Sequence, residues 1–193
     1  MLFEQIRPYL RFVRYLELDG NSSYSSLVPY DARMFYATSG SGAITAGGKS
    51  YIIQKGCMLI IPAGVEYMLH TPESGVVYLA INFDYSGNSS DKKTSIPPAP
   101  PSHFDISYMT ESVTFDNLTQ FNSPLHFTEM FSAEKRLEEL EREFARKLVL
   151  YEFKISSIFA DILSECARLS GAIGFSPSEK TAEKNTQLHT FQF

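Results

Sequence analysis

The side chains best suited to metal binding or catalysis are few in this chain and lie far apart. The histidines are His70, His103, His126 and His189, and their spacing is not that of metal ligands. No serine lies in a nucleophile elbow, and the glycine pairs lack the strand-to-helix context of a phosphate-binding or dinucleotide-binding loop. These residue types and spacings therefore indicate neither a metal centre nor a nucleophilic active site.

The two cysteines are also poor candidates for chemistry. Cys57 and Cys166 are far apart in sequence, and each lies among apolar residues. We expect two buried free thiols, in preference to a disulfide or a catalytic cysteine.

Composition narrows the class of protein further. The chain has 193 residues, 44% of them apolar, which is enough for one good core. Its net charge is −5 and its pI is about 5.4, so we do not expect this segment to bind DNA or RNA by itself. No apolar run is long enough for a membrane span, and arginines interrupt the N-terminus where a signal peptide would be apolar. We expect a cytoplasmic protein with no membrane partner.

The first half of the chain reads as short strands separated by turns of glycine, proline, asparagine and serine. Such turns recur about every ten residues, which is typical of an antiparallel sandwich or barrel. Ser39–Gly42 is predicted to be a turn, and Gly47–Gly48 is a strong hairpin signal. The expected strands cover residues 9–18, 33–38, 43–46, 51–54, 57–61, 67–70, 76–85 and, as the last, 106–115.

Residues 86–103 form a polar, proline-rich loop. Four of the five residues Pro97–Pro101 are prolines, which excludes helix and sheet interior. A loop this long is either mobile or functional. It is a simple connector or a lid over the barrel mouth, and the sequence leaves both open.

Two amphipathic helices are predicted after the strands, over about 129–148 and 150–169, with Gly171 and Gly174 as stop signals. One apolar stripe is enough for packing on the barrel. The second helix also carries Tyr151, Phe153 and Leu163 off its stripe, which favours a second partner. We therefore expect a homodimer through these helices. The predicted contact residues are Ile155, Ile158, Phe159, Ile162, Cys166 and Leu169.

Gly56, Pro62 and Gly64 form the pattern G-x5-P-x-G, which resembles the second half of the cupin barrel signature. The resemblance implies a histidine ligand at the position of Tyr67 and an acidic ligand at that of Arg33. It also implies an H-x-H pair near residues 26–29, where the chain has no histidine. We therefore expect a cupin barrel without a metal and without another cofactor.

The order of barrel, two helices and polar linker resembles the N-terminal sensor and dimerisation region of AraC-type transcriptional regulators. The phrases YDARMFYATSGSG, YIIQKGCMLIIPAGVEY, LAINFDY and FDNLTQFNSPL carry this resemblance, which covers roughly residues 5–172. It implies a small-molecule effector, and DNA binding only through a domain absent from this chain. It also implies an N-terminal arm, Phe3–Arg11, that closes over the pocket.

Strand alternation then gives candidates for a ligand site inside the barrel, because residues i and i+2 share a face. Polar and aromatic side chains at these positions suit a small wet cavity, and the resemblance extends sugar contacts to Tyr78, Ala80 and Asn82. Two alternatives stay open: side chains fill the barrel, or Arg33 pairs with Asp31 or Asp84. The candidate ligand-binding residues are Arg33, Phe35, Tyr67, Leu69, Tyr78, Ala80 and Asn82.

Taken together, we expect a mainly β fold with an α appendage: a cupin-like jelly-roll barrel and a two-helix dimerisation hairpin. Residues 1–125 would form the sensor barrel, 126–175 the hairpin, and 176–193 a linker that starts the missing DNA-binding domain. The expected function is effector sensing by a transcription regulator that is not an enzyme. A stand-alone cupin isomerase or dioxygenase is the main rival, and a barrel that only dimerises is the third possibility.

Overall fold

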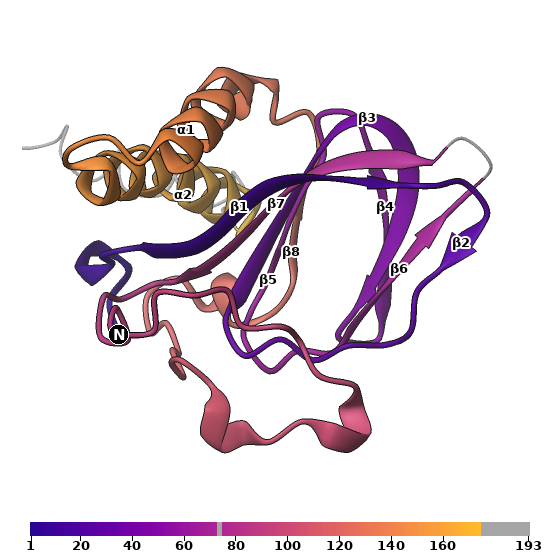
Figure 1. Cartoon of the computed structure of the whole chain (residues 1–193), viewed down its shortest axis with the longest axis horizontal. Helices are drawn as coiled ribbons and strands as arrows, with labels where there is room; N and C mark the ends of the chain where they lie inside the picture. The colour runs from indigo at the N-terminus through magenta and orange to yellow at the C-terminus, as the bar shows by residue number, and fades with distance from the viewer. Residues whose placement is uncertain (73–74, 175–193) are drawn as a thin grey trace, which may run out of the picture.

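The computed structural model describes residues 1–72 and 75–174. The described residues form a cupin-like jelly roll of antiparallel strands with a layer of two helices on one side (Figure 1). This is the predicted fold class. The strands are β1 (Tyr9–Leu18), β2 (Ser22–Ser23), β3 (Ala32–Ala46), β4 (Lys49–Gln54), β5 (Met58–Ile61), β6 (Tyr67–Thr71), β7 (Val76–Asp84) and β8 (Leu125–Phe127). The helices are α1 (Glu134–Arg146) and α2 (Tyr151–Gly174).

Strand β3 belongs to both sides of the jelly roll. One sheet has the order β1-β7-β3-β5-β8, and the first half of β3 pairs there with β5 and β7. The second half of β3 pairs with β4 and β6 instead, and β6 also pairs with β2. The continuous strand therefore bends from one sheet into the other, which encloses an interior between them (Figure 1).

The turn predicted at Ser39–Gly42 is absent, because the chain stays extended through it. The pairing of β3 with β7 instead shifts register between Ala37 and Ser39, which marks a β-bulge. Gly40 lies just beyond the bulge with φ +72°, where a Cβ atom would come within 2.3 Å of the Gly75 carbonyl oxygen. Gly40 therefore allows the strand to bend, and it does not form a turn. The hairpin predicted at Gly47–Gly48 is confirmed between β3 and β4.

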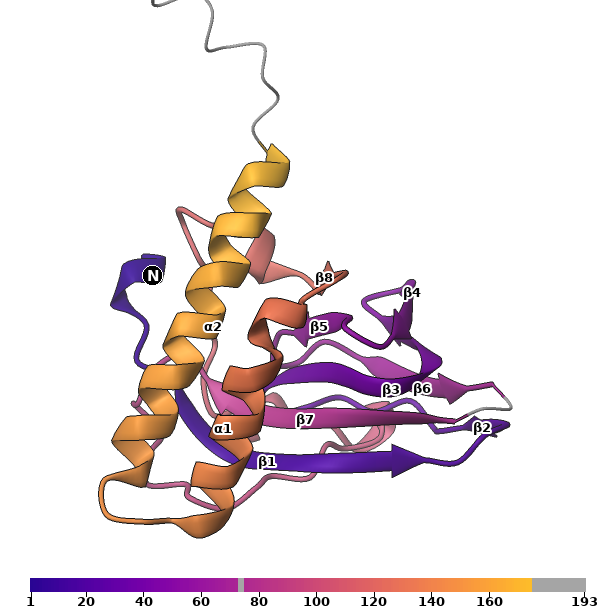
Figure 2. The same ribbon diagram turned by 90° about the horizontal axis from the view of Figure 1, so that it is seen from above.

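Alternation along β3 and β7 separates two hydrophobic cores. Met34 and Ile81 belong to the core between the sheet and the helices, whereas Phe35 and Ala80 belong to the barrel interior. Because β7 is central and covered on both faces, all of its residues except Val77 are buried. The helix layer and the interior are thus organised by opposite faces of the same strands (Figure 2).

The helices pack on this sheet within one chain, and this packing buries most of the residues predicted to form the dimer contact. Of its six residues only Leu169 is exposed, at 41%, and the others are buried in the core against the sheet. In this arrangement these five side chains pack within the chain. The helix also runs through Gly171 to Gly174, so the predicted stop at Gly171 is wrong. The buried five are Ile155, Ile158, Phe159, Ile162 and Cys166.

The segment between β7 and β8 leaves the sheet and forms short 3-10 helices, as Figure 1 shows. These include η2 (Pro101–His103), η3 (Ile106–Tyr108) and η4 (Thr119–Asn122). The strand predicted over 106–115 is therefore wrong, and β8 takes the edge beside β5. The linker predicted at 176–193 lies outside the described residues. Within the part of the chain that the structure describes, no helix is long and apolar enough to cross a membrane.

Candidate functional site

The interior of the barrel brings together the residues that alternation on the strands had grouped. Phe35 stands at the centre of an aromatic wall, with its ring centroid 5.7 Å from that of Tyr67 and 5.9 Å from that of Tyr78. Leu69 packs against this cluster from the edge and is half-buried. All of the other candidates, Arg33, Phe35, Tyr67, Tyr78, Ala80 and Asn82, are buried.

One end of this interior is polar and carries charge. The Arg33 guanidinium forms an ion pair with Asp31, with Nη2 2.8 Å from Oδ1, so one of the structural pairings foreseen for Arg33 exists. Its Nη2 also donates a hydrogen bond to the Ile96 carbonyl oxygen, over 2.9 Å. Asn82 donates a hydrogen bond to Ser95 Oγ over 3.2 Å. Both predicted polar residues thus hold the proline-rich loop.

A second buried ion pair lies nearby and was not foreseen. Arg11 Nη2 lies 2.5 Å from Asp84 Oδ2, and neither side chain is exposed. Asp84 also accepts a hydrogen bond from Thr110, while Arg11 donates to the carbonyl oxygens of Ser89 and Lys92. A signal was available: alternation placed Asp84 on the inward face, where a buried carboxylate requires a cationic partner.

Several polar atoms in the interior have no hydrogen-bond partner within the described part of the chain. They include Nε of Arg33 and the hydroxyl of Tyr78. Burial raises the pKa of the Tyr78 and Tyr67 hydroxyls, so both stay protonated at neutral pH. Buried polar groups are normally paired, so the lack of a partner at these two atoms is unusual.

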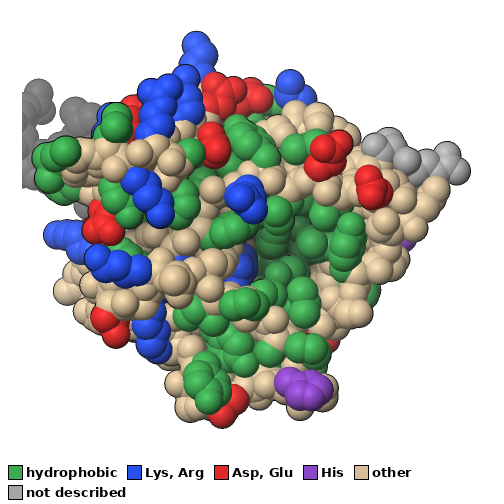
Figure 3. Space-filling model, viewed as in Figure 1, with side chains coloured by type: hydrophobic (Ala, Val, Ile, Leu, Met, Phe, Trp, Pro, Cys, Tyr) green, Lys and Arg blue, Asp and Glu red, His purple; other side chains and the backbone are tan. Residues whose placement is uncertain are grey.

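The interior also opens to the surface. Figure 3 shows a hollow with hydrophobic side chains gathered in it, on the face that Figure 1 views. A separate pocket of about 340 Å³ lies near Tyr67 and Glu66. Thr45 and Met68 also line it, and they face away from the interior because they alternate with Ala46 and Tyr67.

These residues do not fit the metal that cupin barrels commonly hold. Arg33 brings a positive charge into the interior, and Tyr67 is a protonated phenol. His70 is exposed on β6, where its Nδ1 lies 2.7 Å from Ser23 Oγ, and His126 is half-buried beside Tyr51. In residues 1–72 and 75–174 there is no cluster of three or more histidine, cysteine or acidic side chains suited to a metal ion. His189 lies outside the described residues.

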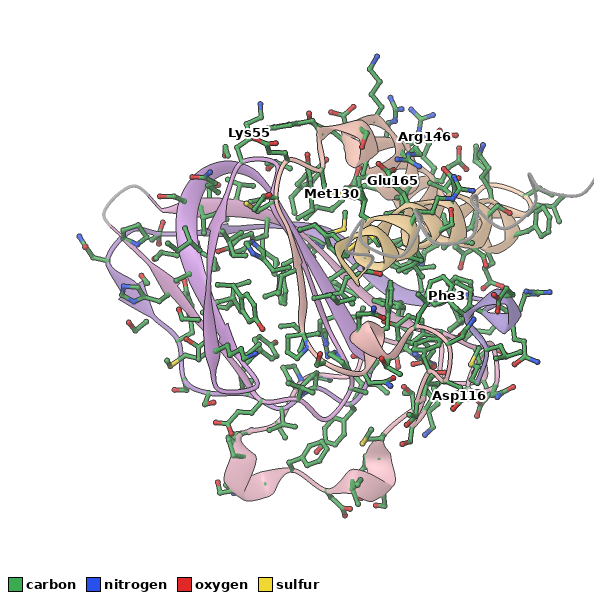
Figure 4. The ribbon with its side chains drawn as sticks, turned by 180° about the vertical axis from the view of Figure 1, so that it is seen from behind. Phe3, Lys55, Asp116, Met130, Arg146 and Glu165 are labelled. Atoms are coloured by element: carbon green, nitrogen blue, oxygen red, sulfur yellow. The ribbon has the colours of Figure 1, made fainter. Side chains whose placement is uncertain are left out.

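The N-terminal segment does not close over the interior, contrary to the expected arm. Phe3 is buried on the helix side of the sheet, with its ring centroid 4.8 Å from that of Phe121 and 5.3 Å from that of Phe115. The terminal amine contacts Asp116 over 3.0 Å (Figure 4). The aromatic residues of the N-terminus and of the 111–122 segment therefore complete the core beneath the helices.

The proline-rich loop covers the polar end that the arm leaves free. Val28 and Ala99 exchange backbone hydrogen bonds of 2.7 and 3.0 Å, which anchors the far end of the loop. The buried side chains of Arg11, Arg33 and Asn82 hold its middle. Of the two roles open to this loop, the contacts favour that of a cover.

No protein-family model and no curated protein matches this chain. Among solved structures, it is similar to a salicylate 1,2-dioxygenase from Pseudoaminobacter salicylatoxidans, with 20% identity over 38% of this chain and a TM-score of 0.36. It is also similar to an oxalate decarboxylase of Bacillus subtilis, with 22% identity over 37% of this chain and a TM-score of 0.33. The chain spans about 20% of the length of each.

These similarities correct one expectation from the sequence. We expected a protein that is not an enzyme, and this is contradicted because the solved structures with the same kind of barrel are enzymes, a dioxygenase and a decarboxylase. At 20–22% identity the likeness shows the fold alone. What the chain shares with these proteins is the cupin-like barrel.

Proposed function

We propose that this chain is the effector-binding and dimerisation part of an AraC-type transcription regulator, with a small ligand held inside the barrel. The observation that carries the proposal is the pair of unpartnered donors, Arg33 Nε and the Tyr78 hydroxyl, beside an aromatic wall. Two donors and an aromatic face suit a small oxygen-rich ligand, such as a sugar or a small carboxylate.

In the proposed complex, ligand oxygens accept hydrogen bonds from Arg33 and Tyr78, and the ligand's apolar face stacks on Phe35. Arg33 also holds the loop through the Ile96 carbonyl oxygen, so its contacts link the ligand to the cover. Ligand binding would then shift the population of loop arrangements. DNA binding would belong to a domain outside this chain.

Dimerisation is proposed through the exposed part of the helical hairpin. The hairpin tip, which we define as Leu148, Val149, Leu150 and Phe153, carries four exposed apolar side chains. Exposed apolar side chains gathered in one place commonly mark an interaction site. This tip replaces the buried stripe that the sequence had indicated.

The decisive experiment is a calorimetric screen of sugars and small carboxylates against the wild-type chain, Tyr78→Phe and Tyr36→Phe. Tyr36 also carries a buried hydroxyl without a partner among the described residues, but it faces the helix core. Tyr78→Phe should weaken ligand binding by about tenfold, the value of one hydrogen bond. Tyr36→Phe should leave binding unchanged.

Two outcomes would contradict the proposal. The first is that no sugar or carboxylate binds, or that both variants weaken binding equally. The second is stoichiometric iron, manganese or zinc in the purified protein by elemental analysis, which would favour the rival of a cupin isomerase or dioxygenase.

A further inference from the structure

A second pocket lies outside the barrel, on the outer side of the proline-rich loop. Its volume is about 660 Å³, within the range of small-molecule sites. Three segments that are distant in sequence supply its apolar walls, namely Tyr30, Ile96 and Tyr108. The other lining residues are the consecutive Asp91, Lys92, Lys93 and Thr94.

Neighbouring side chains and a backbone hydrogen bond hold the aromatic wall of this pocket in place. Tyr30 is buried and stacks on Phe104, with ring centroids 5.0 Å apart, and meets the edge of Tyr108 at 6.1 Å. The Thr110 amide donates a hydrogen bond to the Tyr30 carbonyl oxygen over 2.9 Å. Tyr108 itself is 63% exposed, so it has apolar surface that nothing in the described structure covers.

The opposite side is held from beneath by the buried arginines. Arg11 Nε donates to the Lys92 carbonyl oxygen over 2.7 Å, and Arg33 donates to that of Ile96. These bonds fix the backbone that carries the lysine and isoleucine side chains. A wall that is already fixed lowers the entropic cost of binding a ligand.

The charge at the rim is positive. Lys92 and Lys93 are both exposed, and no ion pair involves either of them in residues 1–72 and 75–174. Asp91 is the single acidic residue among the lining residues, which leaves a net charge of +1. Lysine heads beside an apolar wall match an anionic group on an apolar body.

We propose that this pocket binds an amphipathic anion. Its flat aromatic or alkyl body would lie against Tyr30 and Tyr108, and one carboxylate, sulfonate or phosphate group would face Lys92 and Lys93. The site lies outside the barrel and is independent of the function proposed above. Because Arg33 contacts the loop from the inside, a ligand here would hold the cover of the barrel closed.

The test is a fluorescence titration with 8-anilinonaphthalene-1-sulfonate, an aromatic anion. Tyr108→Ala and the double variant Lys92→Ala/Lys93→Ala change exposed side chains, so both should fold. Each should weaken binding of the probe by about fivefold, from lost stacking or lost charge. Decanoate should displace the probe, and decanol should displace it less well.

Three controls separate this site from others. Lys49→Ala/Lys55→Ala makes the same change of charge on and beside strand β4, and Lys55 lies on the far side of the molecule from the loop (Figure 4). Phe153→Ala removes apolar surface at the hairpin tip, and Tyr78→Phe alters the interior. None should change binding of the probe. Equal weakening by any of the three, or no saturable binding at all, would overturn the proposal.

Discussion

At the scale of single residues, the buried carboxyl groups make stability depend on pH. Burial raises the pKa of Asp31 from 3.8 to about 6, although Arg33 opposes this shift. Burial likewise raises the pKa of Glu111 to about 7. Above pH 4 the unfolded chain releases the Asp31 proton while the folded chain retains it. Rising pH therefore favours unfolding, until the folded carboxyl has also ionised near pH 6.

We predict that the free energy of unfolding falls between pH 4 and pH 7, with about 3 kcal/mol of the fall due to Asp31. Urea unfolding at a series of pH values measures this. Asp31→Asn should lose that part of the slope, whatever its effect on absolute stability. Glu111 contributes to the remaining slope, which the lowered pKa of His126 opposes. The exposed Asp19→Asn should keep the full slope. A wild-type profile that is flat from pH 4 to pH 7 would refute the prediction.

Alternation along a strand predicts well which side chains lie on the same face of the sheet, because it depends only on local backbone geometry. It placed Arg33, Phe35 and Asn82 together, and the structure brings them into one interior. It missed Arg11 because the pairing of β1 with β7 shifts register between Leu10 and Phe12. A bulge of this kind redirects a side chain, and it depends on a partner strand that is distant in sequence.

At the scale of elements, the bulge in β3 is what lets one strand serve two sheets. Gly40 and Gly48 have similar φ angles, +72° and +77°, so alanine is strained in the backbone at both. At Gly40 a Cβ atom would also collide with the Gly75 backbone, whereas at Gly48 nothing lies within 4 Å. The two glycines therefore form a matched pair that separates backbone strain from collision.

We predict that Gly48→Ala lowers the free energy of unfolding by about 1 kcal/mol, the cost of the left-handed backbone alone. Gly40→Ala should lower it by about 3 kcal/mol or more, since the sheet must shift to admit the methyl group. Chemical denaturation of both variants gives the comparison. Equal losses would mean that β3 relaxes freely at the bend.

The local sequence could not distinguish these two glycine sites, because both are rich in glycine and read as turns. Pairing with β7 decides that Ser39–Gly42 stays extended, and that pairing is long-range. The strand predicted at 106–115 failed for a related reason. Asp105 accepts a hydrogen bond from the Ser107 amide and begins a 3-10 turn, while β8 pairs with β5.

At the scale of the whole molecule, the helix layer is part of the core of a single chain. Phe159 is fully buried, with its ring centroid 4.7 Å from that of Phe83, whereas Phe153 on the same helix is 74% exposed. We predict that Phe159→Ala lowers the free energy of unfolding by about 3–5 kcal/mol. Phe153→Ala should change it by less than about 0.5 kcal/mol. Similar losses in thermal and chemical unfolding would show that the helices do not pack as described.

The exposed hairpin tip decides whether two copies associate through the helices, as proposed. Val149 is 93% exposed and Phe153 is 74% exposed, and a tip of this kind gains stability when a partner covers it. We predict a concentration-dependent dimer in sedimentation velocity. The double variant Val149→Ser/Phe153→Ser should weaken the affinity of dimerisation by about tenfold or more, because each apolar side chain at the contact contributes about 1 kcal/mol or more. Ile52→Ser removes an equally exposed apolar side chain from β4 and should leave the dimer intact. A wild-type chain that stays monomeric at about 100 µM, where a specific dimer tighter than about −5.5 kcal/mol must form, would exclude pairing through this tip.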